Sequence, residues 1–197
     1  MSTALASCGG GDKKDVKAED TVFTAEELAK KVNVEDVLKN APQLAKSGDT
    51  IIVEGVVDHL CKHGGKKAFI AGTQKNIIRC ESTAAMGGKF AQNTLNQPII
   101  VKGVLKEDRI NEAIVKQMEE SYAEQLKKQE AEHGEDVEVG CETERKAAGQ
   151  ADLNTFADRM ADHRAKIAQS ELKDENGEPY YVQSYYILTT TYVIPEK

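Results

Sequence analysis

Two seven-residue segments of this chain are near-copies of each other, and each has a glycine near its centre. The segments are Ile51–Val57 (IIVEGVV) and Ile99–Leu105 (IIVKGVL). Short runs rich in isoleucine and valine are typical of β-strands. A glycine inside a strand indicates a bulge or a sharp bend, as in a barrel strand that serves two sides. We therefore predict two strands that bend at the same height in one small closed sheet.

The first of these strands leads into a turn that contains histidine and cysteine. Alternate residues of a strand point to the same face, which predicts an apolar face that ends in potential ligands at its rim. That face comprises Ile51, Val53, Gly55, Val57, His59, Cys61 and, at the Gly64–Gly65 turn, His63. Glu54, Asp58 and Lys62 fall on the other face.

Three further strands and a helical insertion complete the prediction. The three further strands are Lys67–Gly72, Asn76–Ser82 and the Tyr- and Thr-rich segment Tyr180–Ile194. The second near-copy segment is predicted to extend over Pro98–Arg109, which makes it the fourth of five strands. Apolar residues recur at helical spacing from Ile110, and again from Leu153 to Ala168, which predicts an antiparallel helical hairpin within 110–175. His163 is predicted to lie on the solvated side of the second helix.

Short helices precede the first strand. Thr24 and Glu27 fit a capping box at the start of one helix. Asn33 fits the N-cap of a second, which is predicted to stop near Pro42. The chain is thus interpreted as a tether over residues 1–22 and one mainly β domain over 23–197, with its strands in 49–109 and 180–194.

Charge and motifs narrow the classes of function. The net charge of −7 argues against a general polyanion binder. Residues 49–109, however, hold nine basic against six acidic side chains, which leaves an anionic ligand open for this half. No run of 18 apolar residues, no CxxC pair, no phosphate loop and no HExxH motif occurs in the sequence. We therefore expect a protein that is not an enzyme.

The N-terminus, MSTALASC followed by GGGDKKD, is similar to a bacterial lipoprotein processing site. A Leu-Ala-Ser-Cys lipobox is cut before its cysteine, so Cys8 would carry the lipid and the polar stretch would be a tether. Only seven residues precede Cys8, fewer than a signal peptide needs. Either the start codon is placed too late or the match is accidental. If Cys8 is lipidated, the protein is held at a membrane of the cell envelope.

The strands resemble those of the oligonucleotide/oligosaccharide-binding (OB) fold, and more narrowly those of tRNA-anticodon-binding-like OB proteins found as bacterial lipoproteins. The resemblance lies in IIVEGVVDHLCKHGGKKAFI, IIRCES, IIVKGVL and the Tyr-rich last strand. It implies a five-stranded Greek-key barrel. OB proteins usually carry a helix between the third and fourth strands, whereas this chain has its helical hairpin after the fourth. Such a hairpin is expected to alter or cover the face that binds ligands in the family.

The His-x-Cys-x-His rim has three interpretations. His59, Cys61 and His63 are suitable ligands for zinc or copper, the only cofactors suggested, with Cys80, His133 or water as a fourth ligand. Alternatively, His59 and Cys61 plug the barrel mouth. In an oxidising compartment, Cys61 and Cys80 would instead form a disulfide.

Basic residues near the same turn are candidates for binding a ligand. Lys62, Lys66, Lys67 and Arg79 could meet a phosphate or an acidic sugar, although a cluster at a hairpin tip is commonly only solvated. The expected function is that of a lipid-anchored OB-fold binding module, whose helical hairpin offers a surface to a protein partner. The alternatives are a metal-binding or redox envelope protein and a single-stranded nucleic-acid binder.

Overall fold

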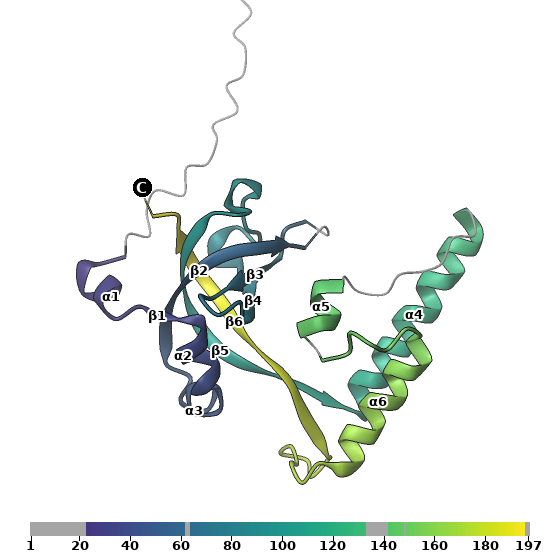
Figure 1. The fold of residues 1–197 in the computed structure, drawn as a ribbon. Helices are drawn as coiled ribbons and strands as arrows, with labels where there is room; N and C mark the ends of the chain where they lie inside the picture. Colours follow the sequence, from purple (N-terminus) through teal and green to yellow (C-terminus); the bar gives the residue numbers. More distant parts are fainter. Residues whose placement is uncertain (1–22, 62–63, 133–141, 148, 196–197) are drawn as a thin grey trace, which may run out of the picture.

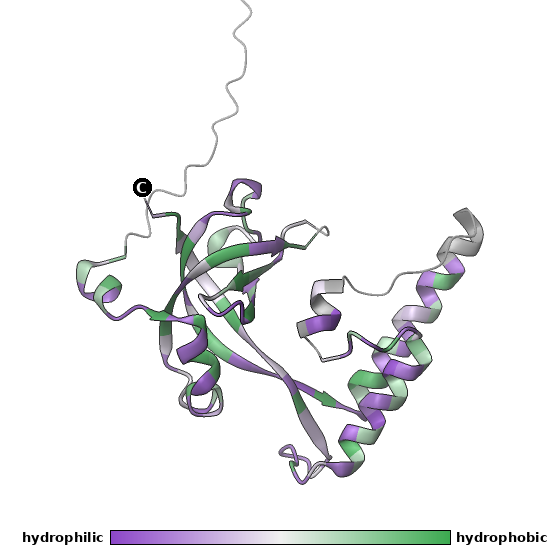
Figure 2. Ribbon diagram, in the orientation of Figure 1, coloured by the Kyte–Doolittle hydropathy of each residue, from purple (hydrophilic) through white to green (hydrophobic). Residues whose placement is uncertain are grey.

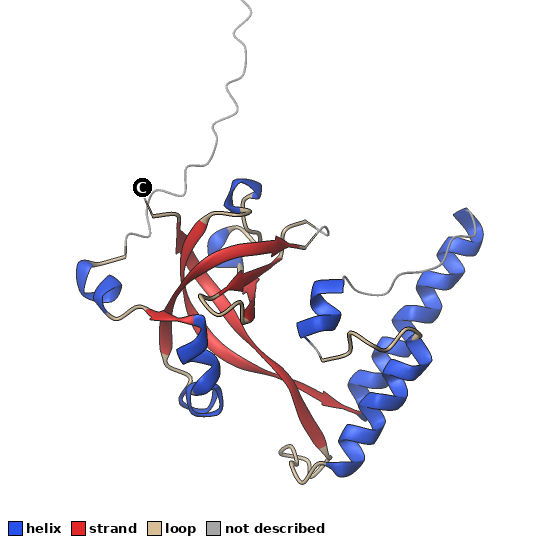
Figure 3. Ribbon diagram, viewed as in Figure 1, coloured by secondary structure: helices blue, strands red, loops and turns tan. Residues whose placement is uncertain are grey.

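The computed structural model describes residues 23–61, 64–132, 142–147 and 149–195. The protein is a mixed α/β protein with one six-stranded sheet, and not the mainly β protein that was predicted (Figure 3). Its elements in order are α1 (Ala25–Ala29), β1 (Val32–Asn33), α2 (Val34–Lys39), α3 (Ala41–Ser47), β2 (Thr50–Leu60), β3 (Lys67–Ala71), β4 (Ile77–Ser82), η1 (Ala84–Met86), η2 (Gln92–Thr94), β5 (Pro98–Asn111), α4 (Glu112–Glu132), α5 (Glu142–Ala147), α6 (Phe156–Gln169) and β6 (Tyr180–Val193).

The strand pairings form a circuit. β2 pairs antiparallel with both β3 and β5, and β3 pairs antiparallel with β4. β4 then pairs parallel with β6, which returns antiparallel to β5 (Figure 1). The two-residue β1, from a segment predicted to be only helical, adds a parallel pairing to β2.

The two near-copy strands, β2 and β5, are direct neighbours, but their glycines do not lie at the same height. Gly55 is opposite Ile99, and Gly103 is opposite Ile51, so the two glycines stand four positions apart along the shared ladder. The prediction of bends at equal height is therefore wrong. Each glycine instead gives room to a different neighbour: a Cβ on Gly55 would meet Ile70, and one on Gly103 would meet Leu188. Gly103 also adjoins an irregularity in the β5–β6 ladder.

A shift of register in β2 changes which residues face inward. The β2–β3 register shifts between Val57 and His59. Val53 and Val57 are buried in the main core, and beyond the shift the buried residue is Leu60 rather than His59. The prediction that His59 shares the face of Val57 is therefore wrong, because the extra residue of a bulge reverses the alternation that follows it.

The short helices begin as predicted, but Pro42 has a different role. Thr24 and Glu27 form the capping box of α1, and the Asn33 side chain caps α2. α2 ends at Lys39, and α3 follows at once with Pro42 in its first turn. Proline fits there because it has no N–H to leave unsatisfied. Pro42 therefore begins a third helix instead of marking the end of the second.

The helical hairpin extends from the ends of β5 and β6. These two strands remain paired as far as Asn111 and Tyr180, and α4 and α6 emerge there and lie side by side (Figure 1). Both helices mix apolar and polar residues along their length (Figure 2). A second core cluster joins the two helices to the paired ends of β5 and β6. Its buried residues are Ile110, Val115, Met160 and Ile167. Ile110 belongs to β5, which corrects its assignment to the helix.

His163 is also placed differently from the prediction. Its side chain is only 2% exposed, on the inner side of α6. Arg164, the next residue, faces outward and forms ion pairs with Glu112 and Glu119 of α4. Within the part of the chain that the structure describes, no helix has the length and apolar character needed to cross a membrane.

Candidate ligand cavity

The structure separates the residues proposed as metal ligands. Cys80 lies in the main core, and burial raises the pKa of its thiol to about 12, which keeps it protonated at neutral pH. His59 lies on the face of β2 opposite Val57, where its Nε2 atom is buried and its ring centroid is 5.7 Å from that of the buried Phe69. His63 and His133 are outside the described residues. Among the described residues, no three His, Cys, Asp or Glu side chains gather to hold a metal, and no disulfide joins Cys61 to Cys80.

Two of the predicted ligand-binding residues meet at one cavity. Lys67 on β3 and Arg79 on β4 line a space of about 480 Å³ between the sheet and the helical hairpin, which we call the hairpin cavity. Lys66 is exposed and is not among its described lining residues, and Lys62 is outside the described part of the chain. The described lining comprises Lys67, Arg79, Glu81, Asp108, Ile110 and Gln183 from the strands, and Ile114, Gln117, Met118, Ser121, Tyr122, Gln125, Arg145, Gln150, Phe156, Arg159, Met160 and His163 from the insertion.

Arg79 is fixed in the wall of this cavity. Its guanidinium contacts Glu81 (Nε to Oε1, 3.1 Å) and Asp108 (Nη2 to Oδ2, 2.9 Å). The same group lies over the ring of Tyr186, 4.9 Å from its centroid. Only 13% of the Arg79 side chain is exposed. Two acids and a ring therefore hold Arg79 in one orientation, and its role is to shape the wall.

Two further arginines come from the insertion. Arg159 on α6 is 8% exposed, and its guanidinium lies 5.7 Å from the centroid of the Phe156 ring. Arg145 on α5 reaches the same cavity because α5 contacts β4 (Figure 1). Burial, and after it the charge of Arg145, lower the pKa of Arg159. Two guanidinium groups thus share a partly desolvated space, where like charges repel more strongly than in water.

A buried hydrogen-bonded network forms another part of the lining. His163 Nδ1 lies 2.6 Å from the Tyr181 hydroxyl, and His163 Nε2 lies 3.3 Å from Gln150 Nε2. Gln150 Nε2 also donates to Asp162 Oδ2 at 3.0 Å. Burial lowers the pKa of His163, so the ring is neutral at neutral pH. An amide nitrogen is only a donor, which makes Nε2 the acceptor and leaves the proton on Nδ1.

Sequence reasoning missed Arg145, Gln150, Arg159 and His163. A signal existed for His163: Phe156, Met160 and Ile167 form an apolar stripe, and His163 lies between them at helical spacing. No comparable signal marked Arg145. It follows an acidic stretch, and only the packing of α5 against β4 brings it to the cavity.

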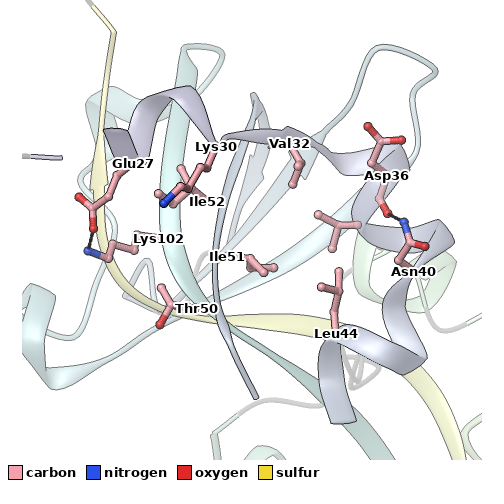
Figure 4. Close-up of a pocket in the computed structure, with 11 residues that line it drawn as sticks. Glu27, Lys30, Val32, Asp36, Asn40, Leu44, Thr50, Ile51, Ile52 and Lys102 are labelled. Carbon is pink, nitrogen blue, oxygen red and sulfur yellow. Dashed lines mark hydrogen bonds and ion pairs between the residues drawn. The ribbon is translucent and has the colours of Figure 1, made fainter. Parts of the chain in front are cut away.

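A second cavity lies between α1, α2–α3 and β2. It measures about 580 Å³, and Figure 4 shows its apolar floor, which includes Val32, Leu44, Ile51 and Ile52. Polar groups at its rim bind each other: Lys102 forms an ion pair with Glu27, and Asn40 Nδ2 donates to the backbone oxygen of Asp36 at 2.9 Å (Figure 4). The Lys102 bond, and after it the Thr24 amide, lower the pKa of Glu27. The hairpin cavity has more converging polar groups, which is what a specific ligand site requires.

Comparisons with known proteins found no matching family model, no matching curated protein and no matching solved structure.

Proposed function

We propose that this chain is a lipid-anchored, non-enzymatic binding module of the cell envelope, built on an OB-type barrel that holds its ligand in the hairpin cavity. The position of the cavity carries this proposal. OB barrels bind ligands on the face of their second and third strands and with the loops after the first and fourth strands. Here the second and third barrel strands are β3 and β4, and both contribute to the cavity lining.

The strand order supports the OB assignment. Numbered within the barrel, β2, β3, β4, β5 and β6 are strands one to five. The third and fifth pair in parallel, and the fourth pairs with both the fifth and the first. That connectivity is the one expected of a five-stranded Greek-key barrel of the OB type. The helical insertion follows the fourth barrel strand, so it takes the place of a loop that commonly contacts ligands.

Filling the cavity provides the test of its role. Ser121 is an exposed residue on α4 that lines the hairpin cavity. We expect the wild-type protein, purified gently from native membranes, to retain a bound molecule that native mass spectrometry detects. In the Ser121→Trp variant, the indole would occupy the space, and at least nine-tenths of the bound species should be lost.

The matched control is Ala123→Trp, which adds the same indole to an exposed position of α4 outside the described cavity lining. It should retain the bound species. Equal retention in Ser121→Trp and wild type would refute the cavity as the site, and so would the absence of any bound species from wild type. The mass of the species also separates a small ligand from a nucleic-acid strand or a protein partner.

The anchor has its own test. Cys8 lies outside the described residues, so its proposed role comes from the lipobox-like sequence alone. In native cells we expect the wild-type protein to fractionate with membranes and the Cys8→Ser variant to become soluble, because several acyl chains together hold a protein firmly in a bilayer. Cys61→Ser is the control and should stay with the membrane. An unmodified Met1 on soluble wild-type protein, seen by intact mass, would contradict the anchor.

A further inference from the structure

We infer that the hairpin cavity binds an uncharged molecule with a hydroxyl-bearing ring, and that the side-chain oxygen of Gln183 accepts a hydrogen bond from it. Sugars and nucleosides share this chemistry. The inference rests on the proposed function and specifies its ligand. It depends on three features of the described lining: a bulge in β6, the pairing of the charged side chains, and a polar stripe on α4 beside two aromatic rings.

Gln183 is the extra residue of a bulge in β6. Asp108 of β5 pairs with Ser184. Arg109, the next residue of β5, pairs with Val182, so the ladder passes over Gln183. A bulge releases one residue from the ladder and redirects its side chain, and bulges are over-represented beside active sites. Here the side chain of Gln183 lines the hairpin cavity.

The side-chain oxygen of Gln183 needs a hydrogen-bond donor. Its Oε1 atom is buried and has no hydrogen-bond partner among the described residues. Most buried polar atoms in folded proteins have a partner, and leaving one unsatisfied costs free energy. A ligand that donates an O–H or N–H to this atom removes that cost, whereas an ionised carboxylate has only acceptors to offer.

The charged side chains of the lining already have partners in the protein. The two acidic side chains of the described lining both contact Arg79. Lys67, Arg145 and Arg159 also have interaction partners within the protein. An uncharged ligand leaves these contacts intact, and it avoids the cost of removing one more charge from water.

α4 presents neutral hydrogen-bonding groups and an aromatic ring to the same cavity. Gln117, Ser121 and Gln125 follow one another at intervals of four residues, so they share one face of the helix. Amides and hydroxyls both donate and accept, which matches the hydroxyl groups of a sugar or a ribose. Tyr122 stacks on Phe156 with ring centroids 4.0 Å apart, and the pair adds an apolar surface for a ring. The volume of about 480 Å³ lies within the usual range of small-molecule sites.

The test measures binding of three probes to the full chain by calorimetry: cellobiose, adenosine and adenosine 5′-monophosphate. We expect cellobiose or adenosine to bind with a dissociation constant of about 1 mM or below. Whichever of the two binds more tightly identifies a sugar or a nucleoside as the source. The monophosphate should bind no more tightly than adenosine. The affinity for the tighter probe should change by less than about twofold when the salt concentration is raised tenfold, because no charges pair on binding.

Gln183→Leu should weaken binding of the tighter probe by about tenfold, because it removes one buried hydrogen bond to the ligand. The same substitution should not lower the urea midpoint, since it replaces an unpartnered buried atom with an apolar group of similar size. Gln169→Leu is the matched control, at an exposed position of α6 outside the described lining. It should leave the affinity unchanged.

Failure of both cellobiose and adenosine to bind at about 10 mM would overturn the inference. A Gln183→Leu variant that binds as tightly as wild type would also overturn it, and so would tighter binding of the monophosphate than of adenosine. The proposed function has a separate fate. If native mass spectrometry finds an ionic molecule that Ser121→Trp displaces, the cavity remains the binding site and only its assignment to uncharged ligands fails.

Discussion

Valine in place of Gly103 is expected to lower the free energy of unfolding by about 3 kcal/mol, at the upper end of the usual cost of overpacking. Gly103 is buried in β5, where a Cβ would contact the Leu188 carbonyl oxygen and lie 2.8 Å from Ile187 Cγ2. The Leu188 atom belongs to the backbone of a paired strand, so it cannot move aside without breaking the ladder. Urea denaturation followed by circular dichroism measures the change as a lower midpoint.

Lys106→Val is the matched control, because Lys106 is an exposed position on the same strand. It should change the free energy of unfolding by less than about 0.5 kcal/mol, as surface substitutions commonly do. An unchanged midpoint for Gly103→Val would show that β5 and β6 do not approach each other as closely as described.

Replacement of residues 112–179 by an Asn-Gly turn is expected to abolish retention of the molecule proposed to occupy the hairpin cavity, while the six-stranded sheet still unfolds cooperatively. Asn111 and Tyr180 are paired, so a two-residue turn can join them. The main core contains no described residue from 112–179, whereas most of the described lining of the hairpin cavity lies within that segment. Ile110 loses its packing against the hairpin, and we expect stability to fall by about 2 kcal/mol, the usual contribution of one buried aliphatic side chain.

Two measurements check this expectation. Urea unfolding should remain a single transition, and native mass spectrometry should detect no retained molecule on the shortened chain. A shortened chain without a cooperative transition would show that the sheet depends on the insertion for folding. A molecule retained by the shortened chain would place the binding site elsewhere.

The sequence predicts best those features that neighbouring residues determine. The capping box at Thr24 and the N-cap at Asn33 each depend on residues three positions apart, and both are present. The strands around Gly55 and Gly103 follow from runs of isoleucine and valine. The role of Pro42 was misread because proline fits both the first turn of a helix and the position just after one.

Features that depend on contacts between distant segments are harder to predict from the sequence. A bulge near Asp58 places His59 on the face opposite Val57, and nothing in the local pattern separates a bulged strand from a regular one. His163 was assigned to solvent because its partners, Gln150 and Tyr181, lie on other segments. Of the candidate site, Lys67 and Arg79 were predicted, while Arg145 and Arg159 depend on how the insertion packs against β3 and β4.

The close approach of Asn111 and Tyr180 has a consequence for how such a protein changes over evolution. Because the two ends of the insertion lie side by side, a longer, shorter or different segment can close the same gap at little cost in chain entropy. The main core would be inherited unchanged, since no described residue of 112–179 belongs to it. One sheet can therefore receive a different set of cavity-lining residues through the exchange of a single continuous stretch, residues 112–179.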